Sequence, residues 1–288
     1  MNTDQASHLR AKMKGIHHQN LAKTIAVVSG KGGGVGKSNI ALNFSLSLSK
    51  KGKKVLLFDL DIGMGGNIEI LLGRSSEHSI LKIFEKNSSI YDIIESGPNT
   101  LSYIPGGNAQ ESIFQLGEEK LVHFLEQLEL ILNDYDYVIF DLGAGVTQET
   151  IHYMKAVDDC LVVTTPEPTS ITDAYSMVKH ILSYKKTQVH LILNRVMNKQ
   201  QGDMITNRMI TAIKRFLEYD MFPLGMVPDD PVVMSAVIEQ HPFLLKNPKS
   251  KASVAIDQIT DQFLGIAPRK KRKGKDFLKE LKQYLSRL

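Results

Sequence analysis

The sequence contains very little cysteine and no tryptophan, since Cys160 is the single cysteine among 288 residues. One cysteine provides neither a disulfide framework nor the thiolates of an iron–sulfur cluster within one chain. No run of eighteen apolar residues occurs, so no segment is expected to span a bilayer. The first residues are polar and lack the apolar stretch of a secretory signal. The cytosol is therefore the expected compartment.

An excess of positive charge is also lacking outside the end of the chain. The chain has a net charge of +4, but residues 269–288 alone contain nine Lys or Arg and two Asp or Glu. The preceding 268 residues therefore sum to −3. A basic tail on a weakly acidic body indicates a local attachment segment, whereas a nucleic-acid-binding body would be basic itself.

Short apolar runs alternate with longer amphipathic ones along the body of the chain. This alternation predicts an α/β fold, with a doubly wound, mostly parallel sheet and helices on both faces. The expected strands are Thr24–Ser29, Lys54–Asp59, Leu101–Pro105, Tyr137–Asp141, Cys160–Thr164, Val189–Asn194 and Phe222–Val227. The expected helices are Lys37–Lys50, Lys120–Asn133, Thr147–Ala156, Ser170–Tyr184, Asp203–Leu217 and Ser250–Leu264. We expect an arm over residues 1–22, one domain over 23–267 and a tail over 268–288.

A glycine-rich loop, Gly30 to Ser38, follows the first expected strand and precedes a helix. This context predicts a phosphate-binding P-loop, because glycines let successive backbone N–H groups turn towards phosphate oxygens at a helix N-terminus. Lys37 would reach the β- and γ-phosphates, and the Ser38 hydroxyl is a suitable Mg²⁺ ligand. The expected nucleotide-binding residues are Gly32, Gly33, Gly34, Val35, Gly36, Lys37, Ser38 and Asn39. One glycine more than the strict P-loop spacing separates Gly30 from Gly36, which leaves the contacting N–H groups open.

Polar residues follow other expected strands at their carboxyl ends, where ligands bind in such sheets. Asp59 and Asp61 are two residues apart, so they can point the same way, one to the Mg²⁺ shell and one to the γ-phosphate. Asp141 ends another apolar run. The ends of two more expected strands carry residues suited to binding a purine. These residues are the amide Asn194 with Arg195, and Pro228 with the polar Asp229. Together these segments predict ATP or ADP, with Mg²⁺, as the ligands.

The tail has an amphipathic helical pattern. At about 100° per residue, its apolar side chains fall on one stripe: Phe277, Leu278, Leu281, Tyr284, Leu285 and Leu288. The basic run 269–273 precedes this stripe, and the combination predicts an interfacial helix on an anionic membrane. The alternative is that the stripe packs on the protein's own surface, and the two arrangements can alternate with nucleotide state.

The early lysine of the loop, Lys31, and the segments around Asp59–Asp61 and Gly143–Gly145 resemble the deviant Walker A ATPases, which include MinD and ParA. The resemblance to the FlhG (YlxH/FleN) family covers nearly the whole chain, including the leader pattern Asp4-Gln5-Ala6-x-x-Leu9-Arg10. It implies an ATP-bound homodimer and slow, dimer-dependent hydrolysis. Within that dimer, Lys31 and Lys37 would act on the nucleotide, Asp61 would orient the attacking water, and Asp59 and Asp141 would support Mg²⁺.

The same resemblance implies a role in flagellar number and placement. The leader residues would stimulate the FlhF GTPase, and the protein would contact C-ring components and the inner face of the cell membrane. From the residues alone, the leader is either a partner-binding arm or a disordered segment. Two rival functions are a MinD-type division-site ATPase and a ParA-type DNA-partition ATPase, although no nucleic acid is expected. A catalytically dead scaffold is a third rival, because of the extra glycines at Gly32–Gly34 and Gly65–Gly66. The lone Cys160 excludes a nitrogenase-type iron protein.

Overall fold

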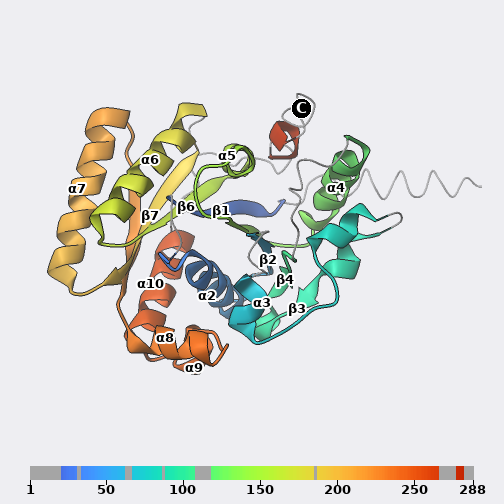
Figure 1. The fold of residues 1–288 in the computed structure, drawn as a ribbon, viewed down its shortest axis with the longest axis horizontal. Coiled ribbons are helices and arrows are strands. Elements are labelled where there is room, and N and C mark those ends of the chain that lie inside the picture. The colour runs from blue at the N-terminus through green and yellow to red at the C-terminus, as the bar shows by residue number, and fades with distance from the viewer. Residues whose placement is uncertain are drawn as a thin grey trace, which may run out of the picture.

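A computed structural model describes residues 21–30, 34–61, 67–85, 88–107, 118–184, 187–265 and 277–281. Its centre is an eight-stranded sheet with the order β3-β4-β2-β5-β1-β6-β7-β8 (Figure 1). The strands are β1 (Lys23–Ser29), β2 (Val55–Leu60), β3 (Glu95–Ser96), β4 (Ser102–Ile104), β5 (Tyr137–Leu142), β6 (Asp159–Thr164), β7 (Gln188–Val196) and β8 (Phe222–Pro228). Only the short β3 pairs antiparallel with its neighbour, β4. The predicted doubly wound, mostly parallel α/β fold is therefore confirmed.

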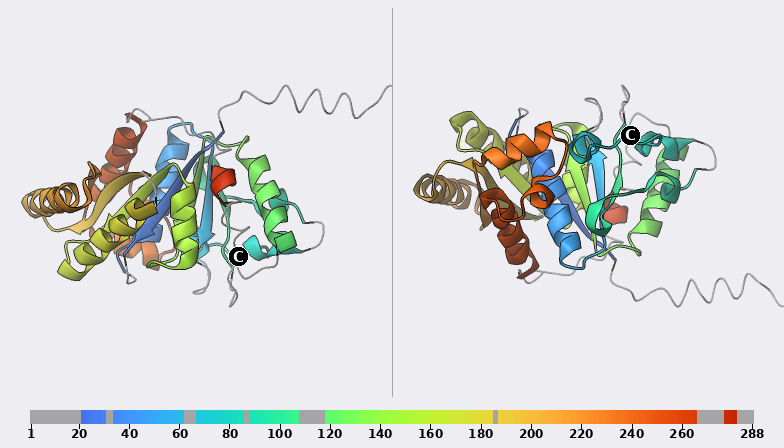
Figure 2. Two further views of the ribbon diagram at one scale, coloured as in Figure 1. Left: turned by 90° about the horizontal axis from the view of Figure 1, so that it is seen from above. Right: turned by 90° about the horizontal axis from the view of Figure 1, so that it is seen from below.

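Helices cover both faces of the sheet (Figure 2). The α-helices are α2 (Lys37–Lys50), α3 (Asn67–Leu72), α4 (Glu118–Ile131), α5 (Gln148–Ala156), α6 (Pro168–Tyr184), α7 (Lys199–Leu217), α8 (Pro231–Ile238), α9 (Phe243–Lys246) and α10 (Lys251–Gly265). Buried residues of α2, α3, α9 and α10 form one hydrophobic core, and those of α4 to α7 form the core on the opposite face. Short 3₁₀ helices lie at Ile80–Phe84, Ile90–Ile93 and Pro98–Thr100.

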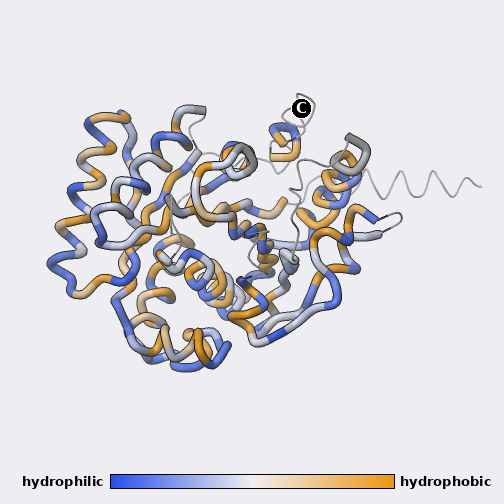
Figure 3. The backbone as a smooth tube through the Cα atoms, viewed as in Figure 1, coloured by the Kyte–Doolittle hydropathy of each residue, from blue (hydrophilic) through white to orange (hydrophobic). Residues whose placement is uncertain are grey.

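The central strands are buried on both faces, as their Val- and Ile-rich sequences require. Every residue of β6 is buried. In β1, all residues are buried except the first, Lys23. In Figure 3 apolar residues run along these strands, while polar residues recur on the outer turns of helices such as α7. None of the helices in the described part of the chain is long and apolar enough to cross a membrane.

All the strands and helices predicted from sequence are present, most within two residues of their predicted ends. Helix α7 begins four residues before the predicted Asp203, because the Asn198 side chain accepts a hydrogen bond from Gln201 N and caps the helix there. The short elements β3, α3, α8 and α9 were not predicted. Periodicity needs more residues than these elements contain, and the Val-rich sequence of α8 gives no helical stripe.

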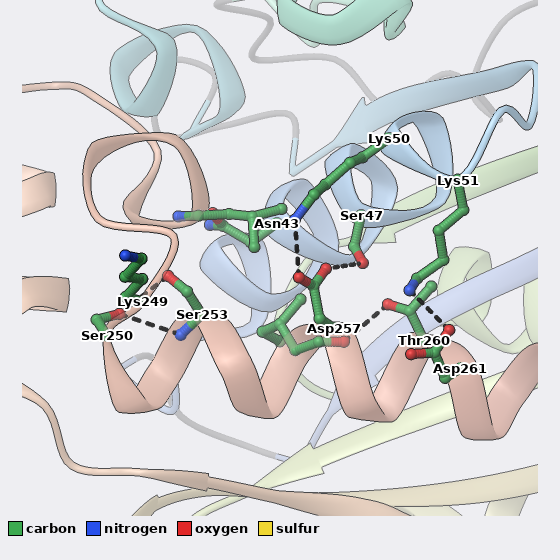
Figure 4. A network of polar contacts seen from close by, with 12 residues as sticks. Asn43, Ser47, Lys50, Lys51, Lys249, Ser250, Ser253, Asp257, Thr260 and Asp261 are labelled. Atoms are coloured by element: carbon green, nitrogen blue, oxygen red, sulfur yellow. Dashed lines mark hydrogen bonds and ion pairs between the residues drawn. The ribbon is translucent and has the colours of Figure 1, made fainter.

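Helix α10 is fastened to α2, the helix that follows the glycine-rich loop, by charged and hydroxyl groups (Figure 4). Asp257 accepts hydrogen bonds from Ser47 Oγ at 2.6 Å and from Lys50 Nζ at 2.9 Å. One turn further on, Lys51 Nζ lies 2.6 Å from Asp261 Oδ1. These contacts attach the middle of α10 to the C-terminal end of α2.

Candidate nucleotide site at the carboxyl edge of the sheet

The glycine-rich loop leaves the carboxyl end of β1 and enters α2. Gly34 and Gly36 have φ values of 93° and 81°, a left-handed conformation that favours glycine. Gly36 is the N-cap of α2 and provides no side-chain cap, so the first amide groups of the helix are available to an anion. The predicted site residues Lys31, Gly32 and Gly33 lie outside the described residues.

Two glycines of the loop are required by close neighbours. A Cβ atom on Gly30 would lie 2.4 Å from Asp173 Cβ, because α6 packs directly against the loop. A Cβ atom on Gly36 would lie 2.5 Å from Asn194 Nδ2, whose amide donates to Val35 O at 2.8 Å. The loop is therefore fixed on two sides, by Asn194 of β7 and by Asp173 of α6.

The side chain of Lys37 is buried among carboxylates. Its Nζ donates to Asp141 Oδ1 at 2.5 Å and lies 4.0 Å from Asp61 Oδ2 and 3.4 Å from Ser38 Oγ. An ammonium group in this position neutralises acidic groups that would otherwise be buried without a counter-charge. A bound nucleotide would compete for the same lysine with its phosphates.

Asp59 and Asp141 are register partners on the adjacent strands β2 and β5, and both are fully buried. Asp59 accepts hydrogen bonds from the backbone N–H groups of Ile68 at 3.0 Å and Asp61 at 3.2 Å. Burial and the neighbouring charge of Asp141 raise the pKa of Asp59 from 3.8 to about 7. Burial also raises the pKa of Asp141, and the Lys37 ammonium opposes that rise.

The raised pKa of Asp59 predicts a pH-dependent stability in buffer without Mg²⁺ or nucleotide. The folded protein holds this proton more tightly than the unfolded chain does, so the stabilisation is complete below pH 3.8 and is lost as the pH rises towards 7. Between pH 5 and pH 8 the wild type should lose about 3 kcal/mol relative to Asp59→Asn, which cannot ionise. Urea unfolding of both proteins at each pH measures this difference, and parallel pH curves would contradict it.

These residues fit Mg²⁺ by their chemistry. Oδ2 of Asp141 is buried and has no hydrogen-bond partner among the residues that the structure describes. The carboxylates of Asp59 and Asp141 and the hydroxyl of Ser38 are hard oxygen donors, and Mg²⁺ prefers such a partial set completed by water and phosphate. A cation placed there would satisfy the orphaned oxygen and release Lys37.

The second acidic segment leads from β5 into α5. Leu142 is buried, so this position offers no side-chain hydroxyl to a ligand. Gly145 has a φ value of 88°, and its carbonyl accepts from the hydroxyl of Thr150 at 3.3 Å. Thr147 caps α5 by accepting from Thr150 N at 3.1 Å. The turn is thus attached to the start of α5, and the two would move together.

The residues predicted to bracket a purine come together at the ends of β7 and β8. Arg195 has a left-handed φ value of 57°, and its Nε lies 3.9 Å from Asp229 Oδ1. The backbone N–H of Asp229 donates to Val196 O at 3.0 Å, which keeps the two strand ends adjacent. Asn194 is mostly buried because its amide holds the glycine-rich loop, so in this arrangement it serves the loop.

Residues 277–281 of the tail lie against the opposite face of the sheet from α2, near α4 and α5 (Figures 1 and 2). Phe277, Leu278 and Leu281 are at most 4% exposed, and Lys279 between them is exposed. The ring of Phe277 stacks on Phe140, with centroids 5.7 Å apart. The described part of the stripe predicted for a membrane, Phe277, Leu278 and Leu281, is here packed on the protein itself, and Phe140 directly precedes Asp141.

Several predicted residues fall outside the described ranges: Asp4, Gln5, Ala6, Leu9, Arg10, Tyr284 and Leu285. Within those ranges the structure brings Lys37, Ser38 and the three aspartates of the predicted site together. Sequence reasoning missed Asp173, which packs against Gly30, and Asn67, which donates to Asp61 Oδ2 at 3.0 Å. The position of Asn67 directly after the glycine-rich residues 63–66 that follow Asp61 was a signal for a role there, whereas Asp173 gave none.

Comparison with known proteins shows similarity along most of the chain. The family model ParA, described as NUBPL iron-transfer P-loop NTPase, matches residues 20–264. Flagellum site-determining protein YlxH of Helicobacter pylori is 34% identical over 270 residues, covering 91% of this chain and 90% of that protein. Antiactivator FleN of Pseudomonas aeruginosa is 28% identical over 251 residues, covering 87% and 89%.

A solved structure shows the same fold. The septum site-determining protein MinD of Pyrococcus horikoshii, complexed with Mg-ADP, superposes with a TM-score of 0.70 and 24% identity over 84% of this chain and 96% of that one. The glycine-rich loop, the paired aspartates and the sheet order are thus found together with similarity along most of the chain. The chain belongs to the MinD/ParA family of P-loop NTPases, in its FlhG (YlxH/FleN) branch.

Proposed function

We propose that this chain is a slow ATPase that dimerises around ATP, attaches reversibly to the membrane and regulates the number and placement of flagella. The observation that carries the ATPase proposal is the convergence of Lys37, Ser38 and three aspartates directly behind the glycine-rich loop. The flagellar part is supported by the names of the relatives YlxH and FleN.

The residues of the site have separate tasks in this proposal. On ATP binding, Lys37 exchanges its contact with Asp141 for the phosphates. Ser38, Asp59 and Asp141 would hold Mg²⁺, either directly or through water. Bound Mg²⁺ supplies positive charge beside the β- and γ-phosphates. Asp61, the acidic residue of the site with partial exposure, orients the attacking water, and Lys31 of a second subunit completes the site.

The tail provides the link to the membrane. Phe277, Leu278 and Leu281 form one apolar stripe, and the stripe cannot contact lipid while it is packed against β5. We propose that it leaves this position and inserts into an anionic lipid surface, with the basic run 269–273 adding electrostatic attraction. Two tails on one ATP-bound dimer would strengthen attachment through avidity.

The leader provides the link to the FlhF GTPase. In this proposal Asp4, Gln5, Ala6, Leu9 and Arg10 contact FlhF, and the folded domain contacts flagellar C-ring proteins. A peptide of residues 1–20 should accelerate GTP hydrolysis by FlhF, whereas the same peptide with Leu9 and Arg10 replaced by alanine should not. Equal rates with both peptides would contradict the assignment.

One measurement tests the combined function. ATP hydrolysis by the full chain is followed with anionic vesicles and with FlhF, added separately and together. Stimulation by vesicles, and binding of FlhF, are the expected results. A protein that responds to vesicles but does not bind FlhF would instead match a MinD-type division ATPase. Stimulation by duplex DNA would indicate a partition ATPase, and no hydrolysis under any condition would indicate a scaffold.

A further inference from the structure

Asn67 is the first residue of α3 and follows Asp61 by six positions in the sequence. Its side-chain Nδ2 donates a hydrogen bond to Asp61 Oδ2 at 3.0 Å. Hydrogen bonds from an amide to a charged carboxylate are stronger than those between neutral groups. Asn67 is therefore in a position to determine how the Asp61 carboxylate is oriented.

The two oxygens of Asp61 have different surroundings. Oδ2 accepts from Asn67 and lies 4.0 Å from the ammonium group of Lys37. Oδ1 lies beside the turn that follows β5, where a Cβ atom on Gly143 would be 3.3 Å from it. The amide of Asn67 thus holds Oδ2 and leaves Oδ1 on the side of Gly143.

Helix α3 has a separate anchor that does not need the Asn67 side chain. The backbone N–H of Ile68 donates to Asp59 Oδ2 at 3.0 Å, and the side chain of Ile68 is fully buried. Leu71 and Leu72 are buried in the same core. The beginning of α3 is therefore fixed by Asp59 and by packing, which leaves the amide of Asn67 to act on Asp61 alone.

We propose that Asn67 is a positioning residue for ATP hydrolysis, whose amide holds Asp61 Oδ2 so that Oδ1 meets the attacking water. Once ATP has drawn Lys37 to the phosphates, loss of the Asn67 donor would leave Oδ2 without its hydrogen bond, and the carboxylate would be free to rotate away from the water. This inference rests on the proposed role of Asp61, but it assigns the orientation of that residue to a second side chain.

The test measures steady-state ATP hydrolysis by the full chain with Mg²⁺, for the variants Asn67→Ala, Asn67→Ser, Asn67→Asp and Asn67→Gln. Loss of one charge-assisted hydrogen bond used in the transition state should lower kcat roughly tenfold to a hundredfold in the Ala variant, with KM for ATP changed by less than about twofold. Asn207→Ala, on the exposed surface of α7, is the matched control and should retain wild-type kcat.

The order of kcat among the Ser, Asp and Gln variants distinguishes two roles for Asn67: positioning Asp61, and starting helix α3. Ser and Asp are favoured where helices begin, so a helix-starting role predicts near-normal activity for both and a loss for Gln. Positioning predicts the reverse: Gln keeps an amide donor and retains the most activity, while Asp repels Asp61 and retains the least. Near-normal kcat for Asn67→Asp would overturn the proposal.

Thermal unfolding of each variant identifies effects on the fold. If Asn67→Ala proved unstable, comparing kcat of Asn67→Gln with that of Asn67→Asp would still test the positioning role. Both side chains are polar, but only Gln donates a hydrogen bond. If Asp61→Ala itself hydrolysed ATP normally, the proposed function of Asp61 would fail. If Asp61→Ala were inactive while all the Asn67 variants were normal, only the positioning role would fail.

Discussion

Replacing Asp61 by alanine should nearly abolish ATP hydrolysis while leaving ATP and Mg²⁺ bound. Asp61 has a partly exposed carboxylate, whereas Asp59 and Asp141 are buried and fit the metal shell. Removing a group that orients the attacking water typically lowers turnover by roughly a hundredfold to ten-thousandfold. Because a trapped nucleotide keeps the subunits together, the variant should elute as a stable dimer in ATP. Single-turnover hydrolysis and light scattering after gel filtration measure both effects.

The control for this experiment is Asp203→Ala, which removes an exposed carboxylate from α7 outside the site. It should hydrolyse ATP as the wild type does and return to monomers as ATP is consumed. Rapid hydrolysis by Asp61→Ala would contradict the assigned role. Loss of ATP binding by that variant would move Asp61 from the hydrolysis step to the binding step.

Deleting residues 275–288 should abolish binding to vesicles that contain anionic lipid, because the deletion removes the apolar stripe. Nucleotide binding should remain, since the tail packs on the opposite face of the sheet from α2. The deletion also removes three buried apolar side chains, each worth roughly 1.5–3 kcal/mol on burial. Its free energy of unfolding should therefore fall by several kcal/mol. Vesicle co-sedimentation, ATP-analogue titration and urea unfolding measure the three quantities.

A single charge in the stripe tests both uses of the tail with one substitution. Phe277→Asp should weaken both vesicle binding and the contact with Phe140. Ile238→Glu, which places a charge on an apolar side chain that is 73% exposed on α8, is the matched control and should change neither. Vesicle binding by the deletion variant at the wild-type level would show that another surface attaches to lipid.

Much of the fold followed from local sequence. Apolar runs bounded by polar residues predicted the strands that are buried on both faces, and amphipathic periodicity predicted the longer helices. The positive φ values of Gly34 and Gly36 agree with a P-loop reading of the glycine run. The acidic residues were predicted to meet because parallel strands end at one edge, and Asp59 and Asp141 are indeed register partners.

The partners of the site residues did not follow from sequence. Lys37 pairs with Asp141 because the two buried charges are more stable together than apart. This interaction joins residues far apart in the sequence, so the local sequence pattern does not predict it. The Asn67 side chain donates to Asp61, and the Asn194 side chain donates from β7 to Val35 in the loop. The tail's position depends on an apolar surface of β5 that exists only after the sheet has formed.

The packing of Phe277 on Phe140 also restricts how the tail can evolve. Under the proposed function, the same side chains must fit a tightly packed protein interior in one state and an irregular lipid surface in the other. Lipid accepts any bulky apolar residue, but the protein interior accepts only those of similar volume. We therefore expect natural substitutions at 277, 278 and 281 to preserve size, whereas positions 284 and 285 are free to vary if they face lipid alone.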